Sequence, residues 1–214
     1  MGTRLYAGLS AAQRSSRRRE QLLAAGLAVF AGRGWAAATV QDVCRAAGLS
    51  PRYFYELFDD RESLFLAVTA DIAAQVQQTV RGALSAADED PELRARAVLQ
   101  ALAGLFADDA RMVRVAFVES LATERLRAQR RELLSEFSTL GARLMRPLSG
   151  APVRGRPRRG LERSAVVLTG GLVEVLITWA DGSDPLPTEL LVDHLTRLYS
   201  AAARLDDTPP RSTP

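Results

Sequence analysis

The sequence predicts an all-α protein, in which a three-helix N-terminal lobe with a helix-turn-helix precedes a larger helical body. Three observations favour this fold class. Two short helical patterns meet across a three-residue turn between Thr39 and Phe58. Apolar residues recur at helical spacing along most of the 214 residues. Residues 1–58 also hold eight arginines against three acidic residues, although the whole chain has a net charge of only +3. This uneven charge is typical of a lobe that faces phosphate.

Residues 1–15 show no sustained period, which predicts a flexible leader, with a DNA-contacting arm as the alternative. The first helix is expected to begin at Ser16 and to end at Gly32 and Gly34. Arg17 and Arg18 lie in its first turn, where positive charge opposes the helix dipole. Contact with DNA phosphate explains these arginines better than helix stability does.

The second helix has clear start and stop signals. Thr39 and Asp42 form a T-x-x-D capping box, which predicts a helix from Val40. Gly48 supplies the left-handed backbone conformation that ends a helix. The helix is therefore about two turns long.

The third helix is predicted to begin with Ser50 as its N-cap and Pro51 in its first position. One face carries Phe54, Leu57 and Phe58 and should join the core. The other face is polar and could enter a DNA groove. Arg52 suits the edge of guanine, whereas tyrosines can reach phosphates and thymine methyl groups. The alternative is an ordinary pair of helices with a solvated polar face.

The predicted DNA contacts divide into two classes. Residues near the bases are Pro51, Arg52 and Tyr53, and residues on phosphates are Arg17, Arg18, Thr39, Ser50, Tyr55 and Arg61.

Residues 17–66 resemble the N-terminal domain of the TetR family of bacterial repressors. The resemblance rests on G-W at 34–35, on T-V-Q-D-V and A-A-G-L-S, and on the family pattern Y-x-x-F-x-x-K-x-x-L at Tyr55, Phe58, Arg61 and Leu64. One helix-turn-helix contacts too few bases for useful specificity, so a homodimer that binds a palindromic DNA operator is expected. The resemblance implies in addition that a small molecule in the helical body shifts the long fourth helix and releases the DNA. It also implies that Arg61 touches backbone phosphate. Leu57 departs from the His or Tyr common in the family, and Tyr53 is bulkier than the usual residue.

The domain boundaries expected from these patterns place the helix-turn-helix domain at 16–58, the effector-binding and dimerisation domain at 59–205, and a disordered tail at 206–214. Within the body, helices are expected from about 61 to 86, 91 to 107, 108 onward and 123 to 148. Residues 149–160 hold three glycines, two prolines and four arginines. They predict a solvated loop, with a second DNA-binding arm as the alternative.

The helix expected at 161–180 is apolar on two faces, and a helix of this kind must be covered from two sides. Together with the helix at 188–205 it predicts a four-helix dimer interface, with a single-chain core as the alternative. The predicted interface residues are Leu168, Gly171, Leu172, Val175, Trp179, Leu191, Leu195 and Leu198.

Large apolar residues on the body helices are weaker evidence for a pocket, since each is better explained as plain core. The candidates for an apolar or amphipathic effector are Phe106, Met112, Phe117, Glu119, Phe137 and Trp179. If Glu119 faced the cavity, a cationic ligand would be expected, because an unpaired buried carboxylate is costly.

Several classes of protein are disfavoured by what the chain contains. With one cysteine, Cys44, and one histidine, His194, neither a disulfide framework nor a zinc site is expected, and no cofactor is predicted. A signal peptide is not expected, and the apolar run at 165–180 is shorter than the roughly 20 residues of a membrane span. A cytoplasmic, non-enzymatic regulator is the main interpretation. The alternatives are an activator, a regulator without an effector, a helical enzyme or carrier, and a helix-turn-helix that binds protein.

Overall fold

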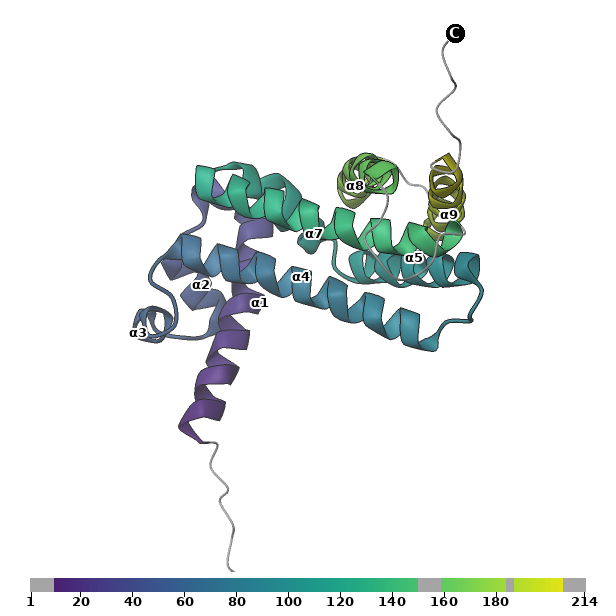
Figure 1. The fold of residues 1–214 in the computed structure, drawn as a ribbon. Helices are drawn as coiled ribbons and strands as arrows, with labels where there is room; N and C mark the ends of the chain where they lie inside the picture. The colour runs from purple at the N-terminus through teal and green to yellow at the C-terminus, as the bar shows by residue number, and fades with distance from the viewer. Residues whose placement is uncertain (1–9, 150–158, 184–186, 206–214) are drawn as a thin grey trace, which may run out of the picture. The chain divides into compact units, whose positions relative to one another are not determined.

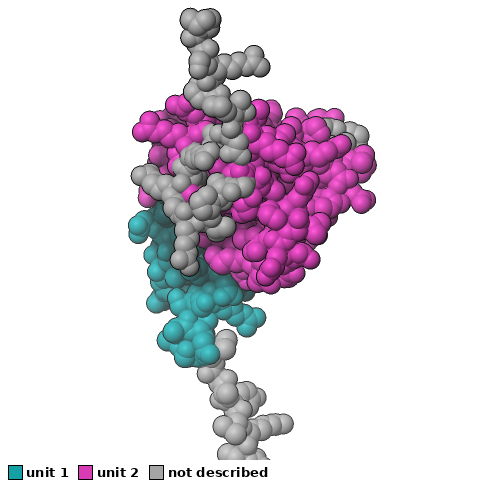
Figure 2. Space-filling model, turned by 45° about the vertical axis from the view of Figure 1, so that its right-hand side comes forward, with its two compact units in different colours: residues 1–71 teal, residues 72–214 magenta. Residues whose placement is uncertain are grey.

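The computed structural model describes residues 10–149, 159–183 and 187–205 (Figure 1). All the regular structure in these ranges is helical. The chain divides into two compact units, residues 1–71 and residues 72–214 (Figure 2). The first nine residues of the predicted leader, most of the predicted 149–160 loop and the predicted tail lie outside the described residues.

The first unit contains α1 (Ala11–Ala37), α2 (Val40–Ala47), α3 (Pro51–Tyr55) and the first turns of α4 (Arg61–Ala86). Helix α1 begins earlier than the predicted Ser16, because Ser10 and Gln13 form a capping box. Gly34 leaves the helical conformation with φ 74°, as its position near the predicted end of the helix suggested.

An aromatic cluster holds the first unit together. The ring of Phe65 lies 5.0 Å from that of Phe30 and 5.3 Å from that of Trp35, measured between centroids. Gly26 lets α1 and α4 approach closely, since a Cβ there would lie 3.1 Å from Val68 Cγ2. The first turns of α4 therefore belong to the N-terminal core. The predicted boundary after Phe58 is too early, because the division into units falls within α4, after Asp71.

The second unit contains the rest of α4 and five further helices: α5 (Pro91–Asp108), α6 (Arg111–Val113), α7 (Glu124–Leu148), α8 (Arg159–Ala180) and α9 (Thr188–Leu205). Between α6 and α7 lie a π-helical turn, η1 (Arg114–Val118), and a 3-10 turn, η2 (Glu119–Leu121). Asp90 caps α5 and Thr123 caps α7 through their side chains. Figure 1 shows α7 lying between α8 on one side and α5 on the other, and α9 packs against α5.

The core of the second unit joins α5, α7, α8 and α9 around Met145, Leu161, Ala165 and Tyr199. Helix α8 has 22 residues, and among the described helices it is the one long and apolar enough to cross a membrane by length and composition. The helix begins at Arg159, before the apolar run of residues 165–180, and the residues that lengthen it include Arg159, Glu162 and Arg163. Leu161, Ala165, Val173 and Leu176 on α8 are instead buried in this unit.

Candidate nucleic-acid interface and ligand cavity

The capping box of α2 forms as predicted, and it is centred on Asp42. The Asp42 carboxylate accepts hydrogen bonds from the Thr39 backbone N–H and hydroxyl, at 3.1 and 2.6 Å, and the Thr39 hydroxyl accepts from the Asp42 N–H. Arg33 and Arg45 donate to the same carboxylate at 3.1 and 3.2 Å. The hydrogen bonds from Thr39, followed by the charge of the arginines, lower the pKa of Asp42.

This network changes the role predicted for Thr39. Its hydroxyl has one proton, which it gives to Asp42 in this structure. A phosphate oxygen needs a donor, so a Thr39–phosphate contact through the hydroxyl requires the bond to Asp42 to break. Thr39 is thus first of all the residue that fixes the start of α2.

Helix α3 begins with Pro51 in its first position, as predicted, but the Ser50 side chain makes no capping hydrogen bond. Ser50 is therefore the N-cap of α3 by position, as predicted, without a side-chain hydrogen bond. Phe54 and Phe58 are buried with their rings 5.7 Å apart, and Leu57 is half-buried beside them. The opposite face is solvent-exposed and carries Ser50, Pro51, Arg52, Tyr53 and Tyr55.

Arg18 and Glu56 link α1 to this exposed face. The Arg18 guanidinium lies over the Tyr53 ring, 4.4 Å from its centroid, and its NH2 lies 3.9 Å from the Glu56 carboxylate. The same carboxylate accepts a hydrogen bond from Arg52 Nε at 3.3 Å. Arg18 Nε is buried without a hydrogen-bond partner. Arg18 was predicted as a phosphate ligand, yet in this structure its packed position orients α3.

The network also contains a residue that was missed. Glu56 was placed on the polar face of α3 and given no role, because a single acidic residue on a DNA-facing helix has no phosphate to bind. Its spacing from Arg52, four residues, was the available signal, since side chains at this spacing meet on a helix.

Arg61 has partners inside the first unit. Its NH1 donates to the backbone carbonyl oxygens of Trp35, at 2.9 Å, and of Ala38. The guanidinium also lies over the Trp35 ring, 4.1 Å from the centroid. Arg61 thus fastens the turn between α1 and α2 to the start of α4. A phosphate contact by Arg61 would have to use its other N–H groups.

All the predicted DNA contacts lie in the first unit, and they fall into two groups by exposure. Arg18 and Arg61 are half-buried, whereas Arg17, Thr39, Ser50, Pro51, Arg52, Tyr53 and Tyr55 are exposed. Arg52 is the most open of those that suit a base edge, with 85% of its side chain exposed. Chemically, this surface offers guanidinium and hydroxyl donors to an anionic, base-containing partner.

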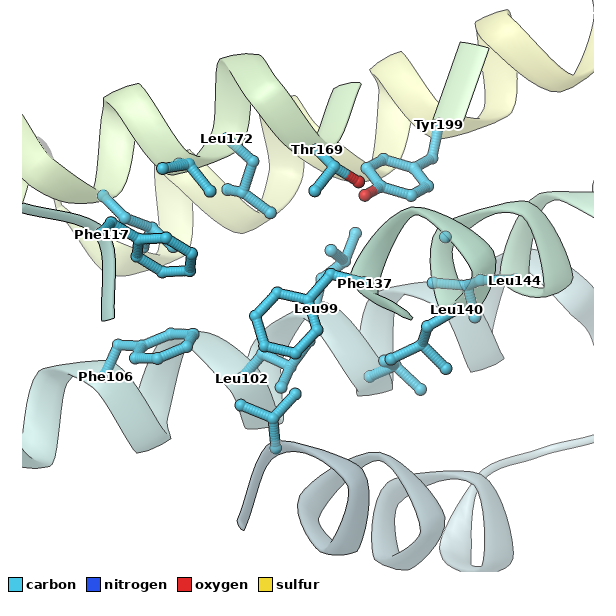
Figure 3. Close-up of a pocket in the computed structure, with 15 residues that line it drawn as sticks. Leu99, Leu102, Phe106, Phe117, Phe137, Leu140, Leu144, Thr169, Leu172 and Tyr199 are labelled. Atoms are coloured by element: carbon cyan, nitrogen blue, oxygen red, sulfur yellow. The ribbon is translucent and has the colours of Figure 1, made fainter. Parts of the chain in front are cut away.

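A cavity of about 60 Å³ lies in the second unit (Figure 3). Three predicted ligand contacts, Phe106, Phe117 and Phe137, line it, and the rings of Phe117 and Phe137 lie 6.3 Å apart. Further lining residues, which the sequence reasoning missed, include Leu99, Leu102, Leu140, Leu144, Leu172 and Tyr199. Aliphatic residues with core spacing carried no signal that would mark them as cavity lining.

The other three predicted ligand contacts do not line this cavity. Met112 is buried elsewhere, Trp179 is half-buried near the end of α8, and Glu119 lies in η2. The Glu119 carboxylate accepts a hydrogen bond from Arg114 Nε at 3.4 Å. The ion pair with Arg114 neutralises this carboxylate, so a cationic ligand is not needed to pair with it.

Two side-chain hydroxyls interrupt the apolar lining. In Figure 3 the oxygens of Thr169, on α8, and Tyr199, on α9, point toward each other at one end of the cavity. Burial raises the pKa of Tyr199 to about 12. This end of the cavity can therefore orient a polar atom of a ligand, and the rest can hold only apolar groups.

The predicted dimer-interface residues on α8 and α9 differ in their exposure to solvent. Leu191 and Leu195 are buried in the core of their own chain, so their assignment to a dimer interface was wrong. Their stripe faces α5 and α7 instead of solvent. Gly171 and Leu198 are exposed, and four residues are half-buried: Leu168, Leu172, Val175 and Trp179. Val167 and Leu190, which were not predicted, are exposed apolar residues on the same two helices.

The comparisons with known proteins agree with this geometry. Residues 22–68 match the family model described as bacterial regulatory proteins, tetR family. No sequence among the curated proteins matches the chain. Among solved structures, the fold is similar to that of the fatty acid degradation regulator FadR from Bacillus halodurans, with TM-score 0.74 and 19% identity, over 86% of this chain and 94% of that one.

Two further structures share the fold. A TetR-like transcriptional regulator from Rhodococcus sp. RHA1 has TM-score 0.69 and 19% identity, over 94% of this chain and 100% of that one. The regulator FadR from Bacillus subtilis, solved in complex with stearoyl-CoA, has TM-score 0.73 and 15% identity, over 86% and 98%.

A capped helix-turn-helix with an exposed basic and aromatic second helix, joined to an all-helical domain with an apolar cavity, defines a DNA-binding transcription regulator. The match at residues 22–68 lies on this lobe and confirms the resemblance seen in the sequence. At residues 22–68 the chain therefore carries a domain of the tetR family of bacterial regulatory proteins, and its fold is similar to that of the solved regulators compared above.

Proposed function

We propose that this protein is a cytoplasmic, non-enzymatic repressor that binds a palindromic DNA operator as a homodimer and is released by a small apolar or amphipathic molecule. The observation that carries the DNA part of the proposal is the orientation of α3. Its exposed face presents Arg52 and Tyr53, and Arg18 and Glu56 hold that face through contacts with both residues.

A dimer is part of the proposal for two reasons. One helix-turn-helix reads too few bases for useful specificity, whereas a twofold dimer reads two half-sites about one helical turn apart. Exposed apolar residues on α8 and α9, namely Val167, Leu190 and Leu198, give a surface that a second copy could cover, with Gly171 open beside them. The expected interface therefore keeps the two predicted helices but not the buried Leu191 and Leu195.

Helix α4 supports a route from ligand to DNA. The same continuous helix supplies Val76 to the cavity lining and Arg61 to the carbonyl groups at the α1–α2 turn. A ligand that enlarges the cavity would push on α4 at Val76. Movement of α4 would then move the helix-turn-helix, because Leu64, Phe65 and Val68 pack in the core of that lobe.

The apolar lining supports an effector with a hydrocarbon portion. The compared regulator from Bacillus subtilis was solved with stearoyl-CoA, and a fatty acyl chain is one apolar group of the kind this lining would accept. The alternatives to a ligand-released repressor are a regulator that activates transcription and a regulator that responds to no small molecule.

A selection from random DNA duplexes tests the proposal. The purified protein is expected to enrich a palindrome, and its affinity should fall steeply as salt is added, because phosphate contacts release counterions. Retention of all duplexes alike, or an affinity for duplex DNA that salt does not change, would overturn the DNA-binding proposal.

A further inference from the structure

A second hollow lies between α7 and α8, and its character differs from that of the cavity. It is an open groove of about 770 Å³, within the size range of small-molecule sites. Three arginines of α7, Arg131, Arg143 and Arg146, line it together with one carboxylate, Glu162 of α8. The groove therefore has more cationic than anionic side chains, and apolar, serine and threonine side chains line the rest of it.

Arg143 and Arg146 are three residues apart on α7, a spacing that places side chains on the same side of a helix. Arg131 is partly neutralised, since its NH2 lies 3.2 Å from Glu124. Arg143 is solvent-exposed, whereas Arg146 is buried apart from 9% of its surface. Arg143 and Arg146 both line the groove from the α7 side, and a pair of guanidinium groups suits an anion with several oxygens, such as a phosphate.

Thr169 connects the two hollows. It is buried on α8 and lines both the apolar cavity and the basic groove. The cavity has an apolar lining, the groove has arginine side chains, and Thr169 lines both. A ligand that used both would need an apolar end and an anionic end.

We propose that the α7–α8 groove binds the anionic head group of an amphipathic effector whose apolar chain enters the cavity past Thr169. This inference rests on the proposed effector site and adds the chemical class of its ligand. The cavity of about 60 Å³ admits only the tip of a chain, because small-molecule pockets usually have about 300–1,000 Å³. Longer chains must displace Phe137, Leu140 or Leu172, which are half-buried.

Three probes test the head group with the full-length protein: decyl phosphate, decanoate and decanol. Calorimetry should show both anionic probes binding about tenfold or more tightly than decanol, since charged hydrogen bonds contribute about 1.5–3 kcal/mol. Inorganic phosphate alone should bind far more weakly than decyl phosphate, because it leaves the cavity unused. Equal affinities for decyl phosphate and decanol, or for decyl phosphate and inorganic phosphate, would overturn the proposal.

Arg143→Gln should abolish the preference for decyl phosphate over decanol, and Arg143→Lys should keep part of it. The matched control is Arg163→Gln, which removes an exposed arginine of α8 that does not line the groove. Equal behaviour of Arg143→Gln and Arg163→Gln would overturn the assignment of the groove. So would a change of mass in light scattering on Arg143→Gln with no change in affinity, since it would make the groove a subunit contact.

Release of DNA is measured separately, with the operator found by selection. If decyl phosphate binds with the expected preference but leaves DNA binding unchanged, the groove assignment holds and the proposed effector function fails. If the preference itself is absent, the groove assignment fails and the proposed function stands.

Discussion

Glu56 accepts a hydrogen bond from the Nε of Arg52, the arginine that suits a base edge, at 3.3 Å. The carboxylate thus restrains the guanidinium that is proposed to contact a base, although its own charge repels phosphate. The restraint lowers the conformational entropy that a flexible arginine loses on binding, which is one way in which preorganised sites gain affinity.

Glu56→Ala is therefore expected to reduce discrimination between operator and random DNA by about tenfold, while total affinity for random DNA rises as negative charge is lost. Competition binding on the two DNAs measures both quantities. Glu20→Ala is the control, because it removes an exposed carboxylate of α1 that bonds to Ser16. A loss of discrimination in both variants would show that only net charge matters.

Arg52→Ala should weaken binding to the operator by about 1–3 kcal/mol and relax the preference at one base pair per half-site. Arg17→Ala, an exposed arginine of α1, should weaken binding to every sequence alike and reduce the salt dependence. Operator libraries randomised at each position give the comparison. If the two variants behave alike, Arg52 contacts only phosphate.

Asp42 should make the protein sensitive to acid. Its pKa is lowered in the folded state, so its contribution to the free energy of unfolding is present above the ordinary pKa of about 4 and is lost as the pH falls through the folded value. Asp42→Asn should therefore lower Tm at pH 7, and its difference from the wild type should shrink below about pH 4. The exposed Asp59→Asn is the control for thermal melts, and a pH-independent difference would contradict the linkage.

Tyr199 should limit stability on the alkaline side. Its pKa is raised from the ordinary value of 10.0 to about 12, so its contribution is complete below about pH 10 and is lost as the pH rises toward 12. The maximum loss is about 3 kcal/mol, from about 1.4 kcal/mol per pKa unit. Urea unfolding of the wild type should show this decline, and Tyr199→Phe should be less affected. A parallel decline in the two proteins would assign it to other groups.

Val167→Glu tests the dimer surface. Val167 is 74% exposed, the largest exposure among the large apolar residues that the structure describes. Its substitution should yield monomers, measured by light scattering. The neighbouring Val166 is also exposed, but it points into the α7–α8 groove. Val166→Glu should therefore leave the mass unchanged, and monomers from Val166→Glu alone would move the interface toward the groove.

The helix-turn-helix could be predicted in detail because its determinants are local. The T-x-x-D box, the left-handed Gly48 and Pro51 in the first position of α3 each act within a few residues of the chain, and the structure shows all three. The start of α1 was missed although Ser10 and Gln13 form the same kind of box, because no apolar stripe accompanies them.

The long-range contacts could not be predicted. Leu195 and Leu198 belong to the same apolar stripe, and only the packing of α9 on α5 decides that Leu195 is buried and Leu198 exposed. Likewise, the sequence suggested that Glu119 is an unpaired buried charge, whereas the turns η1 and η2 place Arg114 within hydrogen-bonding distance of it. Tyr199 gave no signal of a cavity, since a tyrosine in a helix stripe usually belongs to the core.

Arg61 connects the first turn of α4 to the helix-turn-helix. It ties the first turn of α4 to the carbonyl groups of Trp35 and Ala38, just before the Thr39 cap of α2. These hydrogen bonds would couple the helix-turn-helix to any movement of the beginning of α4. An effector acting through α4 would leave each lobe's contacts with its bases intact and change only the distance between the two lobes of a dimer. The ligand would then control which spacing between the two operator half-sites the dimer can bind, and not which base sequence each half-site has.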